Sequence, residues 1–474
     1  MMGYSKAGLG ESSNAFILGA DEGRPRFECP GKAHQAGDVK VEKRKVVAVV
    51  TSLWLIVAAA VVCRVGYAYR ESREIPARAL ASVPFEQETG NIAIALATGK
   101  GFSSPMRRDT GPTAWLTPVY PLIVAGIFCV FGVSTLHAFY AAAALNILFS
   151  AATCVPIYFT GRRMAGIGAA SMAAWLWALF PNAIVIPFQW IWDTSLSALL
   201  AATILWATFA LIESDRVLDW CAYGFLWGFA LLTNPALGAA LPFLLGWMAY
   251  RERREMRGRF VRPAAALGIA ILCCVPWTVR NYVEFHRFIP LRSNLPFELW
   301  LGNNKVFDDR SPDVNARVTR YEEERRYVQL GETAFMKEKW NLATEFIRTH
   351  KRLEVRLVGW RLLDFWLGSF HPVRDFENSD SAWIRIILAF NLLTAMGSLI
   401  GIVVLWRSGS LYVFPAAVFV FAVPLVYYAT HASLRYRHPI DPIVLMLTAI
   451  AVTSAKRGEG GITPPVQEAR ETIP

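Results

Sequence analysis

Three carboxylates lie beside apolar segments, where a charged side chain is energetically unfavourable unless it has a function. Glu86 and Glu88 precede the apolar run Ile92–Ala97, and Asp193 follows Trp190-Ile191-Trp192 at the start of another apolar run. A carboxylate at the edge of an apolar region can act as a general base toward a hydroxyl group. The alternative is structural, because acids favour the first turn of a helix and aspartate often caps the helix that follows it. Both interpretations stay open from spacing alone.

Arginines follow or separate apolar segments in the second half of the chain. Guanidinium groups bind phosphate through two parallel hydrogen bonds, so such arginines are candidates to bind a phosphate group. Snorkelling or pairing with nearby acids is the alternative for each one. The phosphate-binding candidates are Arg280, Arg292, Arg435 and Arg437. Polar residues of the same segments, Asn281, Glu298 and Asn303, are candidates to bind substrate.

The composition indicates that these residues belong to a membrane protein. Hydrophobic residues make up 54% of the 474 residues, above the 45–50% typical of soluble proteins, and the mean hydropathy is +0.34. Ten apolar windows are long enough for helices in a bilayer core of roughly 30 Å. They are 46–66, 135–160, 167–183, 193–212, 218–233, 235–250, 263–280, 383–406, 411–430 and 440–455. We therefore expect an all-α integral membrane protein with about ten transmembrane helices.

An eleventh apolar stretch, 117–132, decides the topology. If it does not cross the membrane, five basic segments fall together on one side, which the positive-inside rule makes cytoplasmic. These segments are Lys40–Lys45, Arg162-Arg163, Arg251–Arg262, Arg407 and Lys456-Arg457. We therefore predict that 117–132 is interfacial or re-entrant. The phosphate-binding candidates and the three acids then lie on the non-cytoplasmic face.

This topology divides the chain into five parts. Residues 1–45 and 457–474 are expected to be cytoplasmic tails, the first of them disordered. Residues 46–281 form an N-terminal transmembrane catalytic core with an external loop at 67–134 that contains interfacial helices. Residues 282–382 form a largely helical external loop domain, with an amphipathic helix near 334–348. Residues 383–456 form the C-terminal transmembrane helices.

Several function classes have no support in the sequence. The net charge of +11 is explained by cytoplasmic loops, and no stripe of basic residues with interleaved aromatics indicates nucleic-acid binding. The seven cysteines contain no CxxC pair, so neither a disulfide framework nor a thiolate zinc site is expected. The sequence also lacks a Walker lysine motif, so ATP hydrolysis is not expected.

The order of these segments resembles the polytopic C-type glycosyltransferases. It is most similar to bacterial relatives of dolichyl-phosphate-mannose–protein mannosyltransferase and of the lipid A aminoarabinose transferase. The resemblance runs from about residue 46 to 455 and rests on five stretches. They are Glu88–Ser103, Pro112–Gly132, Trp190–Thr194, Pro276–Asn303 and Arg435–Pro442.

The resemblance implies an inverting transferase of the plasma (inner) membrane that takes a sugar from a polyprenyl-phosphate donor. The acceptor would be a hydroxyl group on a lipid, a protein or a glycan outside the cytoplasm. Relatives carry one acid in the first external loop, matched by Glu86 or Glu88, and another at the mouth of a later span, matched by Asp193. Many relatives have an Asp-Glu pair where this chain has Glu-Gln-Glu. That departure leaves open which glutamate is the base, and whether a divalent metal ion binds or no cofactor is needed.

Two alternatives from other classes compete with a glycosyltransferase. A transporter or lipid flippase would place ionisable residues near mid-bilayer, whereas the expected span interiors here are almost free of charge. A scaffold without catalysis would not require acids and arginines on one face. The transferase hypothesis therefore leads.

Overall fold

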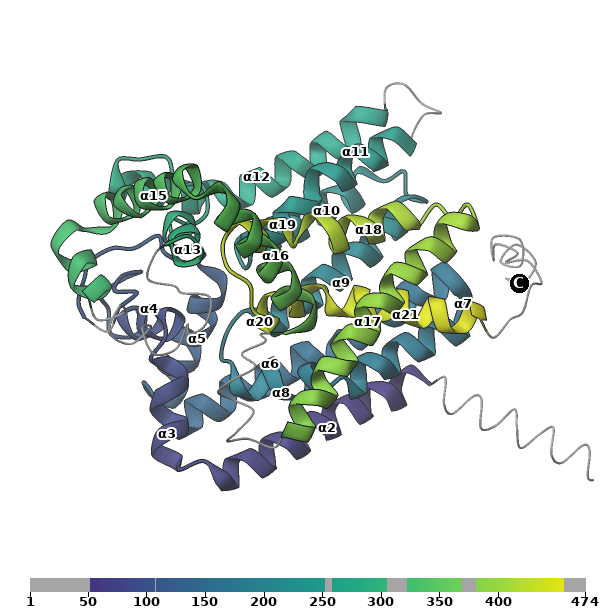
Figure 1. The fold of residues 1–474 in the computed structure, drawn as a ribbon, viewed down its shortest axis with the longest axis horizontal. Coiled ribbons are helices and arrows are strands. Elements are labelled where there is room, and N and C mark those ends of the chain that lie inside the picture. The colour runs from purple at the N-terminus through teal and green to yellow at the C-terminus, as the bar shows by residue number, and fades with distance from the viewer. Residues whose placement is uncertain (1–51, 107, 252–257, 305–321, 369–380, 456–474) are drawn as a thin grey trace, which may run out of the picture. The chain divides into compact units, whose positions relative to one another are not determined.

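A computed structural model describes residues 52–106, 108–251, 258–304, 322–368 and 381–455. The expected tails at 1–45 and 457–474 lie outside these residues. Within the described ranges the chain is helical, and the bridge between Ser103 and Pro112 is the only β-type pairing. The expectation of an all-α membrane fold is confirmed. A helix lies in each of the ten apolar windows (Figure 1).

Six helical stretches of the described chain are long and apolar enough to cross a membrane. Five belong to α2 (Leu53–Glu74), α9 (Thr194–Leu211), α12 (Gly258–Phe285), α17 (Ser381–Arg407) and α20–α21 (Leu434–Arg437 and Asp441–Ala455). The sixth joins α6 (Leu136–Ala152) to α7 (Cys154–Leu179). Shorter apolar helices are α5 (Val119–Phe131), α10 (Val217–Leu231), α11 (Leu241–Arg251), α18 (Val413–Ala422) and α19 (Leu425–Ala429).

The long stretch from α6 to α7 reverses direction within α7. Ala165 and Gly166 leave the helical conformation, and Gly166 takes a φ of +83° that favours glycine. A Cβ atom on Gly161 would lie only 3.0 Å from the Cα atom of Ala170, so the two halves of α7 pack against each other. The turn therefore falls between the windows 135–160 and 167–183, as the sequence predicts.

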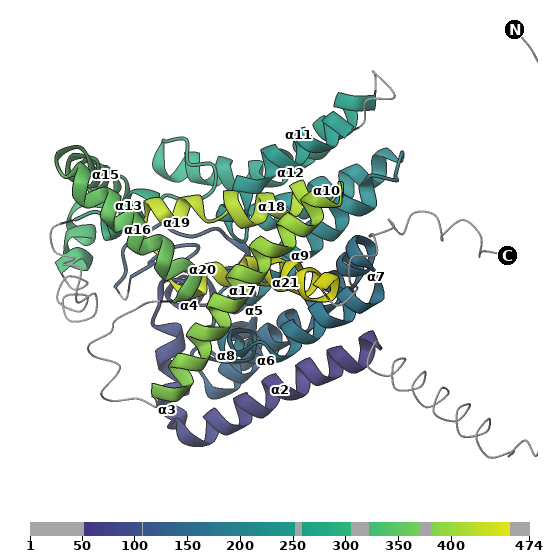
Figure 2. The same ribbon diagram turned by 45° about the vertical axis from the view of Figure 1, so that its right-hand side comes forward.

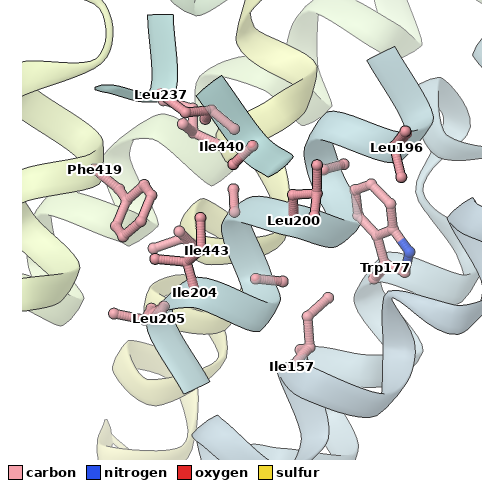
Figure 3. Packing of buried hydrophobic residues seen from close by; sticks show 14 of the residues in the cluster. Ile157, Trp177, Leu196, Leu200, Ile204, Leu205, Leu237, Phe419, Ile440 and Ile443 are labelled. Carbon is pink, nitrogen blue, oxygen red and sulfur yellow. The ribbon is translucent and has the colours of Figure 1, made fainter. Parts of the chain in front are cut away.

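Helices α9 and α20–α21 form the centre of the bundle. Their apolar windows are 72% and 78% buried, against 17% for α2, 28% for α12 and 22% for α17. Leu200, Ile204 and Leu205 of α9 pack among side chains of α7, α18 and α21 (Figure 3). Helices α12 and α17 pack mainly against α10 and α21, respectively, whereas α2 packs against α6, α7 and α8 (Pro181–Gln189) (Figure 2). Their remaining apolar faces are exposed, as is typical of helices that contact lipid.

The two ends of α9 differ in charge. Asp193 precedes its first residue, and Glu213 follows its last turn and forms an ion pair with Arg163. Asp215 pairs with Arg262 at 2.8 Å. Eighteen residues of helix span about 27 Å. Two of the basic segments expected in the cytoplasm therefore lie about one bilayer thickness from Asp193.

One arginine is buried inside the first span. Arg64 of α2 donates hydrogen bonds to the hydroxyl of Ser150 at 2.9 Å and to the carbonyl of Ala178 at 3.0 Å. Ala178 lies in the last turn of α7, where carbonyls have no partner within the helix and a positive charge is favourable. Arg64 therefore joins three helices and plays a structural part.

The segment before α5 contains short helices. They are α3 (Ala77–Ser82), η1 (Val83–Phe85) and α4 (Glu88–Ala97). Helix α5 has 13 residues and would reach about 20 Å, less than the bilayer core. This length agrees with the prediction that 117–132 does not cross the membrane, and that prediction stays untested.

The loop between α12 and α17 is largely helical within its described residues. It contains α13 (Leu295–Gly302), α15 (Glu332–Thr349) and α16 (Lys351–Leu367). The expected amphipathic helix near 334–348 is present as α15. Phe335, Lys339 and Phe346 are buried, whereas Trp340 is 45% exposed.

Candidate active site

A cavity of about 230 Å³ opens where the N-terminal ends of α4, α9 and α13 approach the chain around α20. It brings together five residues that the sequence singles out from four separate segments. They are Glu88, Asp193, Arg292, Glu298 and Arg435. Further lining residues include Trp192, Asn234, Tyr427, His431 and Tyr436. The cavity thus combines carboxylates, guanidinium groups and aromatic rings.

Glu88 is the first residue of α4. The turn before it is tight, because a Cβ atom on Gly90 would lie 2.1 Å from the carbonyl oxygen of Phe85. Phe85 packs edge-on against Phe128 of α5 with ring centroids 4.8 Å apart, which holds the turn on the membrane helices. Glu88 lines the cavity, whereas Glu86 is half-buried outside its lining. The structure therefore distinguishes the two glutamates that the sequence leaves equivalent.

Asp193 stands at the N-cap position of α9, yet its side chain makes no capping hydrogen bond. It accepts a hydrogen bond from the Ser197 hydroxyl at 2.9 Å. Burial raises the pKa of the Asp193 carboxyl above its ordinary value, and the charges of Arg435 and Arg292 act in the opposite direction. An acid that does not cap its helix and lies between arginines in a cavity is a candidate for chemistry.

Arg435 lies among aromatic rings. Its guanidinium carbon is 4.3 Å from the ring centre of Trp192, 5.1 Å from that of Trp190 and 4.9 Å from that of Tyr436. These distances allow cation–π attraction. Its Nη2 atom also donates a hydrogen bond to the Tyr436 hydroxyl at 3.0 Å. The charges of Glu88 and Asp193 both act on Arg435. The guanidinium is therefore held close to both acids.

Arg292 reaches the cavity because a buried carboxylate fixes the segment that carries it. Glu332 of α15 accepts hydrogen bonds from the Ser293 hydroxyl at 2.7 Å and from the backbone N–H of Ala114 at 2.8 Å. It also accepts from Tyr327 at 2.8 Å and from the hydroxyl of Thr113. Glu332 therefore ties α15 to two cavity walls. Glu332 is not among the residues predicted from the sequence, because a glutamate in an amphipathic helix ordinarily faces water.

Besides Glu86, four of the predicted site residues do not line the cavity. Arg280 donates to the carbonyls of Thr113 at 2.6 Å and Phe102 at 2.7 Å, and Asn281 donates to that of Ile289 at 3.0 Å. Arg437 is fully buried, where it pairs with Asp441 at 2.7 Å. These side chains connect segments of the fold.

Asn303, the fourth, belongs to a buried hub around Arg361. Arg361 of α16 donates to the Asn303 side-chain oxygen at 2.8 Å and to the Gly302 carbonyl at 2.5 Å. It also donates to the carbonyls of Tyr428 at 3.0 Å and Ala429 at 3.2 Å. The hub therefore joins α16 to the ends of α13 and α19, which flank cavity residues. Its only sequence signal is an arginine between apolar residues.

The described residues provide no complete protein ligand set for a divalent metal ion. Across the described ranges, no three His, Cys, Asp or Glu side chains come close enough together to hold one. A magnesium ion can instead be bound by one or two carboxylates together with substrate phosphate and water. In the cavity, the charges of Glu88 and Asp193 both act on the guanidinium of Arg435.

Residues 114–279 match the model of the dolichyl-phosphate-mannose-protein mannosyltransferase family. The resemblance expected from the sequence is confirmed. The matched segment contains Asp193 and ends just before Arg280, whereas Glu88, Arg292 and Arg435 lie outside it. The mannosyltransferase-like segment thus supplies Asp193, and flanking segments supply Glu88, Glu298 and both arginines of the cavity.

Solved structures align with this chain at low sequence identity. An oligosaccharyltransferase from Archaeoglobus fulgidus, in complex with Zn and sulfate, aligns with a TM-score of 0.50 and 13% identity. The alignment covers 85% of this chain and 49% of that one, so this chain spans about half its length. ArnT from Cupriavidus metallidurans, bound to undecaprenyl phosphate, aligns with a TM-score of 0.35 and 12% identity over 80% and 77% of the two chains. No curated protein sequence matches this chain.

Proposed function

We propose that this protein is an inverting membrane glycosyltransferase. It transfers a sugar from a polyprenyl-phosphate donor to a hydroxyl group of an acceptor lipid, protein or glycan. The reaction takes place on the non-cytoplasmic face of the plasma (inner) membrane.

The observation that carries this proposal is the meeting of two acids and two arginines in one cavity. Glu88, Asp193, Arg292 and Arg435 come from segments up to several hundred residues apart, yet all line it. A transfer from a lipid phosphate requires a base for the acceptor and cations for the leaving phosphate. The description of the matching family, which names dolichyl-phosphate-mannose, supports a lipid-phosphate donor.

The side of the membrane is supported by charge. The cavity lies at the Asp193 end of α9, and the ion-paired Arg163 and Arg262 lie beyond the other end. Because basic segments favour the cytoplasm, the cavity belongs on the opposite face. A donor anchored by its polyprenyl chain can then reach the cavity from within the bilayer, while a polar acceptor arrives from the aqueous side.

In the proposed step the acceptor oxygen attacks the anomeric carbon opposite the phosphate. The new C–O bond forms as the bond from the anomeric carbon to the phosphate oxygen breaks, which inverts the configuration. Glu88 takes the proton of the acceptor hydroxyl, and polyprenyl phosphate leaves with one additional negative charge. Arg292 and Arg435 stabilise that charge, and a preorganised cation of this kind contributes most in a site that excludes water.

Asp193 has the supporting role. Its raised pKa is a consequence of burial, and its hydrogen bond with Ser197 limits its rotation. We assign it to orienting the acceptor hydroxyl and the guanidinium of Arg435. Glu86, outside the cavity lining, is the second choice for the base.

The experiment that tests this function uses the purified protein in liposomes with radiolabelled polyprenyl-phosphate mannose and, in parallel, other polyprenyl-phosphate monosaccharides. A membrane extract supplies acceptors. The proposal predicts that label moves from lipid to acceptor and that polyprenyl phosphate is released in equal amount. If intact donor instead crosses the bilayer without release of sugar, the protein is a flippase and the proposal is wrong.

A further inference from the structure

A row of hydrogen-bonding groups ends at Arg435. The Nδ1 atom of His431 lies 3.3 Å from the carboxylate of Glu298, and its Nε2 atom lies 2.9 Å from the hydroxyl oxygen of Tyr436. That hydroxyl oxygen accepts the hydrogen bond from Arg435 at 3.0 Å. Glu298 also accepts from the Asn294 side chain at 2.8 Å. All five residues line the cavity.

One arrangement of protons fits the contacts of this row, in which the Nδ1 atom of His431 approaches Glu298 at 3.3 Å without a hydrogen bond of regular geometry. Because Tyr436 accepts from Arg435, its own proton is available for the Nε2 atom of His431. In that arrangement Nε2 is unprotonated, and the proton of the neutral imidazole lies on Nδ1, on the side of the Glu298 carboxylate. Hydrogen bonds aligned in one direction polarise one another, which makes the Tyr436 oxygen a stronger acceptor for the guanidinium.

Aromatic packing holds Tyr436 in place. Its ring stacks on Tyr427 with centroids 4.7 Å apart and planes 11° apart, and His431 meets its edge at 81°. Trp190 and Trp192 flank the guanidinium that Tyr436 contacts. A tyrosine fixed by two rings can direct an otherwise flexible arginine side chain.

We propose that Glu298, His431 and Tyr436 are positioning residues that hold the guanidinium of Arg435 for the donor phosphate, and that they do so while His431 is neutral. This inference rests on the proposed function. Protonation of His431 places a hydrogen on Nε2, so the imidazole can no longer accept the hydrogen bond from Tyr436. The row loses its alignment, and Arg435 is held less firmly.

The charged and titratable groups around His431 come from three elements. Glu298 belongs to α13, Arg361 to α16, and Arg435 and Tyr436 to α20. Burial lowers the pKa of the His431 imidazole below its ordinary value, the charge of Glu298 raises it, and the charges of Arg435 and Arg361 lower it. The imidazole is therefore neutral at neutral pH and becomes protonated on acidification.

The test compares Tyr436→Phe, His431→Gln and the control His137→Gln, whose histidine is exposed on α6. Tyr436→Phe keeps the stacked ring and removes the hydroxyl, so the donor KM should rise roughly 10–100-fold with a smaller change in kcat. In His431→Gln, the amide oxygen of the introduced side chain accepts from Tyr436 and does not titrate. As the pH falls, the donor KM of His431→Gln should therefore rise less than that of the wild type and of His137→Gln.

Ionisation of the substrate and of Glu88 affects the wild type and His431→Gln equally. The difference between their two profiles of donor KM against pH is therefore caused by His431. The inference is overturned if Tyr436→Phe keeps the wild-type KM, or if His431→Gln keeps the wild-type rise on acidification. Binding of polyprenyl phosphate, followed by tryptophan fluorescence, separates this inference from the proposed function. If the wild type binds it with the expected pH dependence but transfers no sugar, the positioning row stands and the proposed transferase activity fails.

Discussion

Replacing Arg361 with lysine should destabilise the segments that carry the cavity residues. The guanidinium is only 6% exposed and makes five hydrogen bonds, to Gly302, Asn303, Glu354, Tyr428 and Ala429. Lysine keeps the charge but presents three donors from a single nitrogen atom, and it cannot reproduce the planar fork. Carbonyls of two different segments would then compete for one ammonium group.

The expected loss follows from the number of contacts. If lysine keeps two of the five hydrogen bonds and each lost one is worth about 1 kcal/mol, the free energy of unfolding falls by about 3 kcal/mol. At about 2 °C per kcal/mol for a large domain, the melting temperature should fall by about 6 °C. The segment from Tyr427 to His431 loses its support, so the donor KM should rise as well.

Thermal unfolding of the purified protein in detergent checks this value. Arg352→Lys is the matched control, because Arg352 lies on the same helix and is exposed. The control should melt with the wild type. Equal melting temperatures for Arg361→Lys and Arg352→Lys would show that the hydrogen bonds of Arg361 contribute nothing to stability, and the hub described here would be refuted.

Three further predictions concern the cavity and its surroundings. Arg292→Lys and Arg435→Lys should each lower sugar transfer at least tenfold at unchanged melting temperature. By contrast, Arg280→Lys and Arg437→Lys should lower the melting temperature and leave the turnover of folded protein near normal. The reason is that the guanidinium groups of Arg280 and Arg437 contact backbone carbonyls or Asp441. Asp193→Asn should slow sugar transfer yet stabilise the protein at neutral pH. The pKa of Asp193 is raised in the folded protein, so the ionised carboxylate is less favourable in the folded than in the unfolded state. Below the ordinary pKa of aspartate, the denaturation curves of the variant and the wild type should therefore converge. A cysteine at Val133 or Ser134, directly after α5, should react with an impermeant reagent added outside the cell, and reaction from the cytoplasmic side alone would contradict the topology.

The sequence predicts the spans well because hydropathy reports burial in lipid directly. Each of the ten apolar windows contains a helix, and the reversal at Ala165–Gly166 falls between two of them. Glu88 and Asp193 each precede an apolar segment, and the topology predicts that both lie on the non-cytoplasmic face. Positions relative to the membrane thus follow from local composition.

The direction of a polar side chain does not follow from composition. Arg280 ends the apolar window 263–280 and Arg292 follows it, yet Arg280 contacts the carbonyls of Thr113 and Phe102 while Arg292 lines the cavity. From the sequence, a lysine such as Lys339 in an amphipathic helix is expected to contact water. In the structure it is 2% exposed, lies 3.9 Å from the ring centre of Trp300 and pairs with Glu323. Such contacts depend on segments that meet only after folding.

The central claim is that the two cavity acids serve sugar transfer, and turnover of conservative variants tests it most directly. Sugar transfer is measured for Glu88→Gln, Glu86→Gln and Asp193→Asn at equal amounts of folded protein, with Glu345→Gln, an exposed glutamate of α15, as control. Loss of a general base costs about 10²–10⁴-fold in rate, so Glu88→Gln should fall by that factor while Glu345→Gln keeps the wild-type rate. If none of the three cavity-region variants falls by even tenfold, these carboxylates serve the fold alone and the proposed mechanism is wrong.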